Sequence, residues 1–222
     1  MLLDILGTLL PFAMGVALSP VPLVAVVVVL GTPRSHTNGP AFAAGWVLGL
    51  SIATTVVLLL AGVVNRASGG GTAVAVLRIL LGLLLLGLAV RKWRGRPAPD
   101  DEPEVPAWMD RIDSLSAGRI FLAGVGLSGA NPKNLALAAA AGAAIASASI
   151  DGAGDAVAVA VFVLLASSSV LGLVVLGLVG GQRADRVLGA IHTFMLRDNA
   201  VIMTVVFLLL GAMVLGNGIS AL

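Results

Sequence analysis

The sequence predicts an all-α membrane protein whose six transmembrane helices form an inverted 3+3 repeat, with helices one and four broken near the midplane. Two observations lead to this class. Of the 222 residues, 59% are hydrophobic and 11% are charged, whereas about a quarter of the residues in a soluble domain are charged. Two similar stretches, Gly15–Ser19 and Gly124–Ser128, are each soon followed by a proline inside a long apolar run. Helix breakers at corresponding places of two halves indicate a transport site.

Six apolar stretches approach the roughly 20 residues with which a helix crosses a bilayer. We expect the spans, in order, at 5–30, 40–64, 72–90, 119–147, 155–179 and 200–218. The first begins with Asp4 and lacks basic residues, so it does not resemble a cleaved signal peptide. The first and fourth are longer than required and contain the breakers. Since a break leaves backbone groups unpaired, each break should be buried in protein or line a wet cavity.

The longest connection separates the two halves of the chain. We expect one membrane domain, residues 1–222, made of repeat one at 1–96, a cytoplasmic linker at 97–107 and repeat two at 108–222. The linker is acidic and proline-rich, which is typical of an irregular segment. Two amphipathic segments, 108–115 and 183–197, are predicted to be short helices lying in the headgroup layer.

The basic residues predict the orientation. Ten of the 13 Lys and Arg residues fall in the first, third and fifth connections, while the second and fourth hold Arg66 alone. The positive-inside rule places the former in the cytoplasm, so both termini of this multi-pass protein of the plasma (inner) membrane are expected outside. Three spans per half is an odd number, so the second half enters from the opposite side and the repeat is inverted.

The candidate substrate-binding residues surround the two breaks. They are Ser19, Pro20, Pro22, Ser128, Asn131, Pro132, Lys133 and Asn134. Lys133 is the most unusual, because a charge at the bilayer centre costs about 2.5 kcal/mol or more and usually faces a cavity or a partner. In a functional role it anchors an anionic group of the substrate or changes its pairing during transport. In a structural role it caps carbonyl groups freed by Pro132 or snorkels through an aqueous vestibule. Asn131 and Asn134 either satisfy the exposed backbone or line a polar path.

Three further features have an ordinary structural interpretation beside a functional one. Arg78 lies near the outer end of its span and is expected to snorkel to the surface. The hydroxyl run Ser167–Ser169 is a weaker site candidate, since such groups commonly bond to their own helix. The spacing of Gly45 and Gly49 allows close helix packing, either within the chain or in a homodimer.

No catalytic or cofactor-binding pattern is present in the sequence. The chain has no cysteine, which excludes disulfides and thiolate metal sites, and it has no P-loop or Ser-His-Asp signature. No acidic residue falls at mid-membrane, so the sequence does not identify a coupling mechanism; Asp155 and Asp198, at span entrances, are the nearest candidates. We expect no enzymatic activity, cofactor, metal or nucleic-acid partner. Membrane lipid and a small-molecule or lipid substrate are the expected ligands.

Several motifs resemble those of a known family. They are Leu18–Pro22, Asn38–Phe42 with Gly45-Trp46, Asn131–Leu135, and Asp198–Ala200 with Ile202. The chain is similar to the GAP family, the glycopeptidolipid- and sulfolipid-addressing proteins of actinobacteria, within the LysE exporter superfamily. The resemblance implies a six-span exporter with an inverted repeat that handles cell-envelope glycolipids. The redox branch of the superfamily requires paired cysteines, which this chain lacks.

Together these features predict an exporter of a small molecule or a cell-envelope (glyco)lipid that works by alternating access, with its site between the two breaks. The alternative is a non-transporting scaffold or accessory subunit of lipid-export or lipid-synthesis machinery. That scaffold would contact its partner through the basic cluster at 91–96 and the linker. A third reading, an intramembrane enzyme, lacks a plausible nucleophile, base or metal set.

Overall fold

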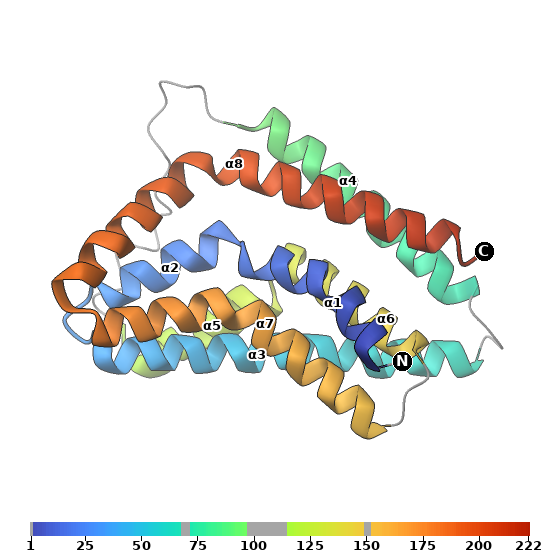
Figure 1. Ribbon diagram of the computed structural model, residues 1–222, viewed down its shortest axis with the longest axis horizontal. Coiled ribbons are helices and arrows are strands. Elements are labelled where there is room, and N and C mark those ends of the chain that lie inside the picture. The colour runs from blue at the N-terminus through green and yellow to red at the C-terminus, as the bar shows by residue number, and fades with distance from the viewer. Residues whose placement is uncertain (1, 68–71, 97–114, 149–151) are drawn as a thin grey trace.

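The computed structural model describes residues 2–67, 72–96, 115–148 and 152–222 (Figure 1). These residues form helices α1 (Leu2–Ala17), α2 (Pro20–Leu30), α3 (Ser35–Ala67), α4 (Thr72–Arg94), α5 (Ala117–Gly129), α6 (Pro132–Ser147), α7 (Gly152–Val179) and α8 (Gly181–Ile219). The all-α class is therefore confirmed for the described part of the chain. The predicted linker and, apart from residue 115, the predicted surface helix at 108–115 lie outside the described residues.

Several helices have the length and apolar character of membrane spans. Three are long and apolar enough on their own: α3 over Ser35–Val63, α7 over Gly152–Val179 and α8 over Ala200–Ile219. Helices α1 and α2 together make a fourth, bent by 54° at their break. The chain is thus a membrane protein. A set of six spans also requires α4 and the joined α5–α6 pair to cross the membrane, and this stays a prediction.

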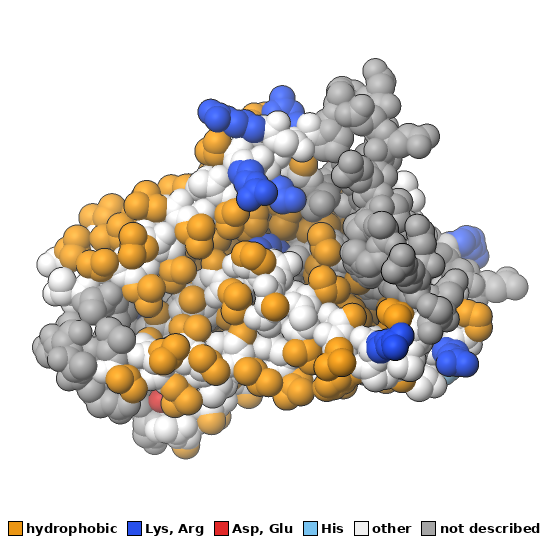
Figure 2. Space-filling view, turned by 180° about the vertical axis from the view of Figure 1, so that it is seen from behind, with side chains coloured by type: hydrophobic (Ala, Val, Ile, Leu, Met, Phe, Trp, Pro, Cys, Tyr) orange, Lys and Arg blue, Asp and Glu red, His pale blue; other side chains and the backbone are white. Residues whose placement is uncertain are grey.

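The outward-facing side chains agree with a lipid environment. On α3, apolar residues at helical spacing, Leu48, Ile52, Val56 and Leu59, are between 44% and 61% exposed. Figure 2 shows apolar side chains over most of one face, with Lys and Arg gathered along its upper edge and toward one end. Such a surface suits lipid along its apolar part and water or headgroups at its basic margin.

Both helix breaks form where the sequence places breakers. Helix α1 ends at Ala17 and α2 begins at Pro20, while α5 ends at Gly129 and α6 begins at Pro132. Proline is favoured in the first turn of a helix, because its fixed φ suits the helix and its missing N–H is not needed there. An extended N-cap residue precedes each proline, Ser19 in the first break and Asn131 in the second.

The segment at 183–197 is not a separate short helix, so that part of the prediction was wrong, while its place in the headgroup layer stays a prediction. It is the first part of α8, one helix from Gly181 to Ile219 whose ribbon changes direction in Figure 1. No glycine or proline lies between Arg197 and Ala200, so nothing local ends the helix before the apolar stretch begins. The segment still has two faces, since Leu188 is buried and Phe194 is exposed.

Helices α4 and α8 pack side by side and lie over one side of the other helices (Figure 1). The N- and C-termini lie at one end of the long axis, and the α2–α3 and α7–α8 connections lie at the other. Termini at one end agree with an even number of spans. The side of the membrane that this end faces stays a prediction.

Glycines bring α3 and α5 into backbone contact. A Cβ atom added to Gly45 would meet the carbonyl group of Phe121, and one added to Gly129 would lie 2.9 Å from the carbonyl oxygen of Gly49. A Cβ on Gly124 would meet the carbonyl oxygen of Phe42. The Gly45–Gly49 pair is therefore used for packing within the chain, the first of the two roles that its spacing allows.

Candidate functional site

A pocket of about 380 Å³ lies where the two breaks meet α4 and α8. We call it the break pocket, and its lining residues are Ser19, Val21, Leu88, Arg91, Lys92, Gly95, Asn131, Pro132, Lys133, Met203 and Phe207. The break between α1 and α2 contributes Ser19, and the break between α5 and α6 contributes Asn131 and Pro132. The structure thus brings the two interrupted segments to one cavity, although they are far apart in the sequence.

The structure divides the eight predicted site residues into two groups. Four of them line the break pocket: Ser19, Asn131, Pro132 and Lys133. The other four are buried next to the breaks and do not line it: Pro20, Pro22, Ser128 and Asn134. The hydroxyl of Ser128 donates to the carbonyl oxygen of Val125 in its own helix, at 3.2 Å. This second group shapes the breaks and does not face the cavity.

Lys133 is buried, with 6% of its surface exposed, and is the second residue of α6. Its ammonium nitrogen lies 3.7 Å from the sulfur of Met203 on α8. Within the described residues, no carboxylate pairs with this ammonium. Because a thioether is a weak acceptor, the three N–H donors of Lys133 keep most of their capacity. Among the described residues, the buried charge of Lys133 therefore has no strong partner.

The side-chain amides of Asn131 and Asn134 form hydrogen bonds with backbone groups at the second break, so Lys133 is not needed for that purpose. The side-chain oxygen of Asn131 accepts a hydrogen bond from the backbone N–H of Lys133 at 3.0 Å. The side-chain amide of Asn134 donates to the carbonyl oxygen of Leu127 at 3.0 Å, a carbonyl that the interrupted helix leaves available. Of the two readings of Asn134, the structure supports local satisfaction of the backbone.

The first break is completed from another helix. The hydroxyl of Ser169 on α7 donates to the carbonyl oxygen of Ala17 at 2.7 Å, across 152 residues of sequence. Its neighbour Ser168 donates to Leu165 in its own helix, also at 2.7 Å. The buried hydroxyl of Ser167 has no hydrogen-bond partner among the described residues. Ser19 makes no capping hydrogen bond, so its hydroxyl is available at the break pocket.

Sequence reasoning missed the contribution of α4 and α8 to the pocket. The sequence suggests the basic cluster at 91–96 as the partner contact of a scaffold, yet Arg91 and Lys92 line the same cavity as Lys133. The signal was present in the sequence as cations in the last turn of an apolar helix. What the sequence does not contain is the packing of α4 against α8, which brings this turn to the breaks.

The pocket has the chemistry of a site for an anionic amphiphile. Three cationic residues line it, Arg91, Lys92 and Lys133, and no acidic side chain is found among the described residues of its lining. Leu88, Met203 and Phe207 supply apolar surface beside them. Sulfate, phosphate or carboxylate groups are the usual ligands of such cations, and apolar walls suit a hydrocarbon part. In the described part of the chain, no group of three or more His, Asp or Glu side chains is arranged to hold a metal ion.

Comparison with known proteins gives one match. The family described as Sap, sulfolipid-1-addressing protein, matches residues 9–220. No curated protein and no solved structure matches the chain. The family match supports the GAP resemblance, while membership of the LysE superfamily stays a prediction. Because the match covers almost the whole sequence, this chain belongs to the family of sulfolipid-1-addressing proteins.

Proposed function

We propose that this protein exports an anionic cell-envelope (glyco)lipid, or a small molecule of similar chemistry, and that the break pocket binds its charged group. The observation that carries the proposal is the buried ammonium of Lys133, which pairs with no described carboxylate and shares its cavity with Arg91 and Lys92. The membership of a lipid-addressing family supports the same class of cargo. The proposal involves no covalent chemistry, cofactor or metal.

The physical reason is the free-energy cost of keeping these positive charges in the pocket without a counter-ion. An ammonium buried without a counter-ion is unfavourable by several kcal/mol, and like charges at one cavity add repulsion. A bound sulfate, phosphate or carboxylate removes both penalties at once. Binding is therefore strongest for a ligand that brings one negative group to Lys133 and leaves its apolar part against Leu88 and Phe207.

Alternating access between two inverted repeats is the mechanism that we propose for the movement. Helix contacts occur in pairs that correspond when the halves are exchanged: α1 packs on α7 as α5 packs on α3, and α2 contacts α8 as α6 contacts α4. The contacts of α3 with α7 and of α4 with α8 join helices that occupy corresponding places in the two halves. Such pairing supports a pseudo-two-fold relation, which gives two equivalent arrangements of the halves.

We further propose that the cargo is loaded from the cytoplasm. Arg91 and Lys92 belong to the basic third connection, which the positive-inside rule places there. They also line the break pocket, so the pocket lies toward the cytoplasmic ends of the helices. Both termini then lie on the outer side of the plasma membrane, where the cargo would be released.

The test compares two lipids that differ by one sulfate. The purified protein in lipid nanodiscs is titrated with sulfated galactosylceramide and with uncharged galactosylceramide, and binding is followed by native mass spectrometry. We expect preference for the sulfated lipid. We expect Lys133→Ala to weaken its binding by about tenfold to a hundredfold, and Lys133→Arg to retain most of it, as a charge-assisted hydrogen bond requires.

A matched control removes a cation elsewhere. Arg186 is exposed on α8 and does not line the break pocket, so Arg186→Gln should leave the binding unchanged. Equal binding of both lipids, or equal binding by the Ala and Arg variants of Lys133, would refute the proposed site. Transport itself is measured in proteoliposomes, as movement of a fluorescent sulfated lipid between leaflets. Binding without movement would favour the accessory-subunit alternative.

The accessory-subunit alternative has one observation in its favour. At the end of α4, Trp93 is 48% exposed and the guanidinium carbon of Arg96 lies 4.0 Å from the centre of its ring. An exposed aromatic–arginine pair is a common element of protein interfaces. If this end docks on a partner, Trp93→Ala with Arg96→Ala should abolish co-purification of that partner and leave lipid binding at the break pocket intact.

A further inference from the structure

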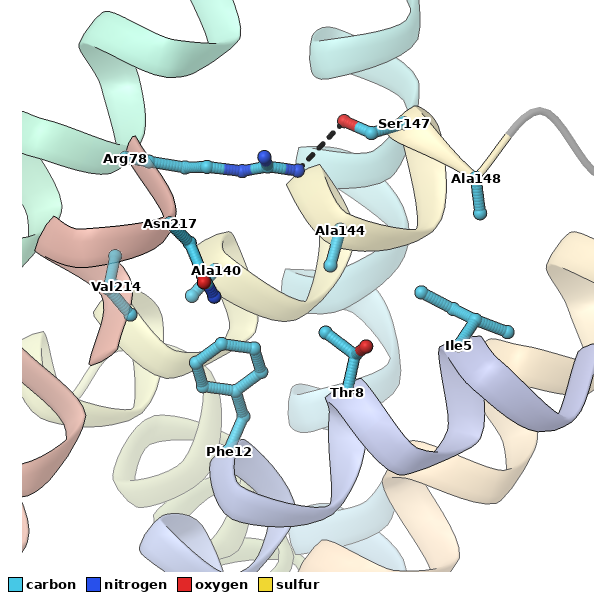
Figure 3. Close-up of a pocket in the computed structure, with 10 residues that line it drawn as sticks. All are labelled: Ile5, Thr8, Phe12, Arg78, Ala140, Ala144, Ser147, Ala148, Val214 and Asn217. Carbon is cyan, nitrogen blue, oxygen red and sulfur yellow. Dashed lines mark hydrogen bonds between the residues drawn. The ribbon is translucent and has the colours of Figure 1, made fainter. Parts of the chain in front are cut away.

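A second pocket, of about 310 Å³, lies at the other end of the same set of helices (Figure 3). We call it the Arg78 pocket, and its lining residues are Ile5, Thr8, Phe12, Arg78, Ala140, Ala144, Ser147, Ala148, Val214 and Asn217. Helices α1, α4, α6 and α8 contribute these residues, close to the end of the molecule that holds both termini. Nothing in the proposed function so far uses this cavity.

We infer that the Arg78 pocket is a second site for the anionic group of the cargo, and that an apolar contact over Gly15 closes the route between the two pockets. The inference rests on the proposed function. It adds a second binding site on the predicted outer side of the membrane and identifies the barrier that the cargo must pass.

Arg78 has the features of an anion ligand. Figure 3 shows its side chain reaching from α4 toward α6, where it donates a hydrogen bond to the hydroxyl of Ser147 at 3.0 Å. This position differs from the snorkelling that the sequence predicts, because the side chain crosses the pocket toward another helix. A guanidinium has five N–H donors, and none of the described carboxylates pairs with this one. Thr8 and Asn217 add polar groups to the same cavity.

The two pockets lie along one line of side chains. On α6, residues spaced by three or four run from the break pocket to the Arg78 pocket: Lys133, Leu137, Ala140, Ala144 and Ser147. On α8 the corresponding series is Met203, Phe207, Leu210, Val214 and Asn217. Residues at this spacing share one face of a helix. On the remaining side, Thr8, Phe12, Gly15 and Ser19 continue the line along α1 into the first break.

Between the pockets the line is closed by apolar packing. The place where a Cβ atom of Gly15 would sit lies 2.5 Å from a terminal carbon of Leu210 and 3.1 Å from one of Leu137. Val206 lies 3.6 Å from the same point. Leu137 has no exposed surface, and Leu210 has 5%. An anion therefore cannot cross this contact unless α8 moves away from α1 and α6.

This arrangement fits an amphiphile with one charged end. Arg78 in one pocket, and Arg91, Lys92 and Lys133 in the other, offer positive charge to the headgroup. The closed contact offers only apolar surface, which a hydrocarbon chain can occupy and a hydrated anion cannot. A free inorganic anion would find the same guanidinium at Arg78 but no favourable surface beyond it. The shared chemistry is the sulfate, phosphate or carboxylate group, and the experiment separates the two sources.

The absence of cysteine in the natural chain permits a clean test. In the full-length protein in nanodiscs, Thr8→Cys places one thiol in the Arg78 pocket, and its rate of reaction with a small water-soluble maleimide reports occupancy. We expect sulfated galactosylceramide to slow labelling and uncharged galactosylceramide to leave it unchanged. Sodium sulfate at the same concentration should protect weakly if the lipid headgroup is the natural ligand, and fully if a free anion is.

Two changes made in the Thr8→Cys background test the role of Arg78. Arg78→Gln should weaken the protection by about tenfold, and Arg78→Lys should retain part of it. Asn217→Asp keeps the shape of an exposed side chain and adds a carboxylate to the pocket, so it should weaken protection even if Arg78→Gln fails to fold. Protection that is equal for both lipids, or unchanged by Arg78→Gln and Asn217→Asp, would overturn the second site.

The outcome is separable from that of the proposed function. If Lys133→Ala abolishes lipid binding and Arg78→Gln changes nothing, the break pocket stands and the second site falls. If neither lipid binds the wild-type protein, the proposed function itself fails.

The barrier is tested with Gly15→Val, which would enlarge the apolar contact between the pockets. We expect lipid movement to slow by tenfold or more while binding at the break pocket persists. Gly7→Val in the same helix has no atom within 4 Å of its Cβ and serves as control. Equal transport by the two variants would place the barrier elsewhere.

Discussion

Lys133 and Ser169 show how single side chains make an interrupted membrane helix workable. A break exposes backbone carbonyl groups, and the structure answers them with Ser169 at the first break and Asn134 at the second. With those groups satisfied, the ammonium of Lys133 has the sulfur of Met203 as its one hydrogen-bond partner among the described residues. A residue that neither pairs with a carboxylate nor serves the backbone is kept at a price in stability, which indicates a ligand.

We therefore expect Lys133→Met to stabilise the protein while it weakens binding of the sulfated lipid. The substitution replaces a buried, unpaired charge by an apolar side chain of similar length, a change that stabilises proteins by about 1–4 kcal/mol when the fit is good. The melting temperature in detergent, without added lipid, should rise. Lys92→Met, at an exposed position, should move it little. A lower melting temperature for Lys133→Met would mean that the lysine has a structural task.

The hydroxyl of Ser169 gives a second prediction. Ser169→Ala removes the donor to the Ala17 carbonyl and should destabilise the protein by about 1 kcal/mol, as expected for a lost interhelical hydrogen bond in a membrane protein. Ser168→Ala is the control, because that hydroxyl bonds only to its own helix. Thermal denaturation of both variants in the same detergent provides the comparison, and equal effects would contradict the assigned role.

The helices themselves were predictable to different degrees. Both breaks could be predicted from proline in an apolar run, since Pro20 and Pro132 favour the first turn of a new helix. Proline alone does not decide this, because Pro11 lies inside α1 without ending it. The continuity of α8 could not be predicted, because an amphipathic segment has the same sequence pattern whether it is a separate helix or the start of a longer one. The approach of α4 to the breaks could not be predicted either. Apolar helices offer many equivalent faces, and the chosen one depends on fit with α8.

Close packing of α3 on α5 leads to a prediction with an internal control. Gly124→Ala would place a Cβ against the carbonyl oxygen of Phe42 and 2.9 Å from the nitrogen of Trp46, so we expect a loss of about 1–3 kcal/mol. Gly126→Ala, two residues along α5, meets nothing within 4 Å and should be neutral or slightly stabilising, since alanine favours helix. The melting temperatures of the two variants should move in different directions.

In the whole molecule, two pockets lie along the seam between the α4–α8 pair and the other helices. The site as a set of residues was only half readable from the sequence. Ser19, Asn131, Pro132 and Lys133 follow from the breaks, whereas Arg91, Lys92, Met203 and Phe207 come from helices whose placement depends on packing. The Arg78 pocket could not be predicted for the same reason, because its residues come from four helices and share no sequence motif.

The predicted orientation can be measured directly. In a chain without native cysteine, Ser220→Cys near the C-terminus and His36→Cys at the start of α3 are both exposed positions. In intact cells a membrane-impermeant maleimide should label the former and not the latter, which should react only after permeabilisation. The reverse pattern would invert the direction in which the two pockets are visited.

The bond between Ser169 and Ala17 also has a consequence for biosynthesis. Ser169, which donates a hydrogen bond to the Ala17 carbonyl, is synthesised 152 residues after Ala17. The carbonyl therefore enters the bilayer before its donor exists. The second break needs no such delay, because Asn134 reaches Leu127 from within its own neighbourhood. We therefore expect the amino-terminal half to lack this hydrogen bond at Ala17 until α7 packs against it. A fragment that ends at residue 96 should be degraded quickly by membrane quality control and should be rescued when the remaining half is co-expressed.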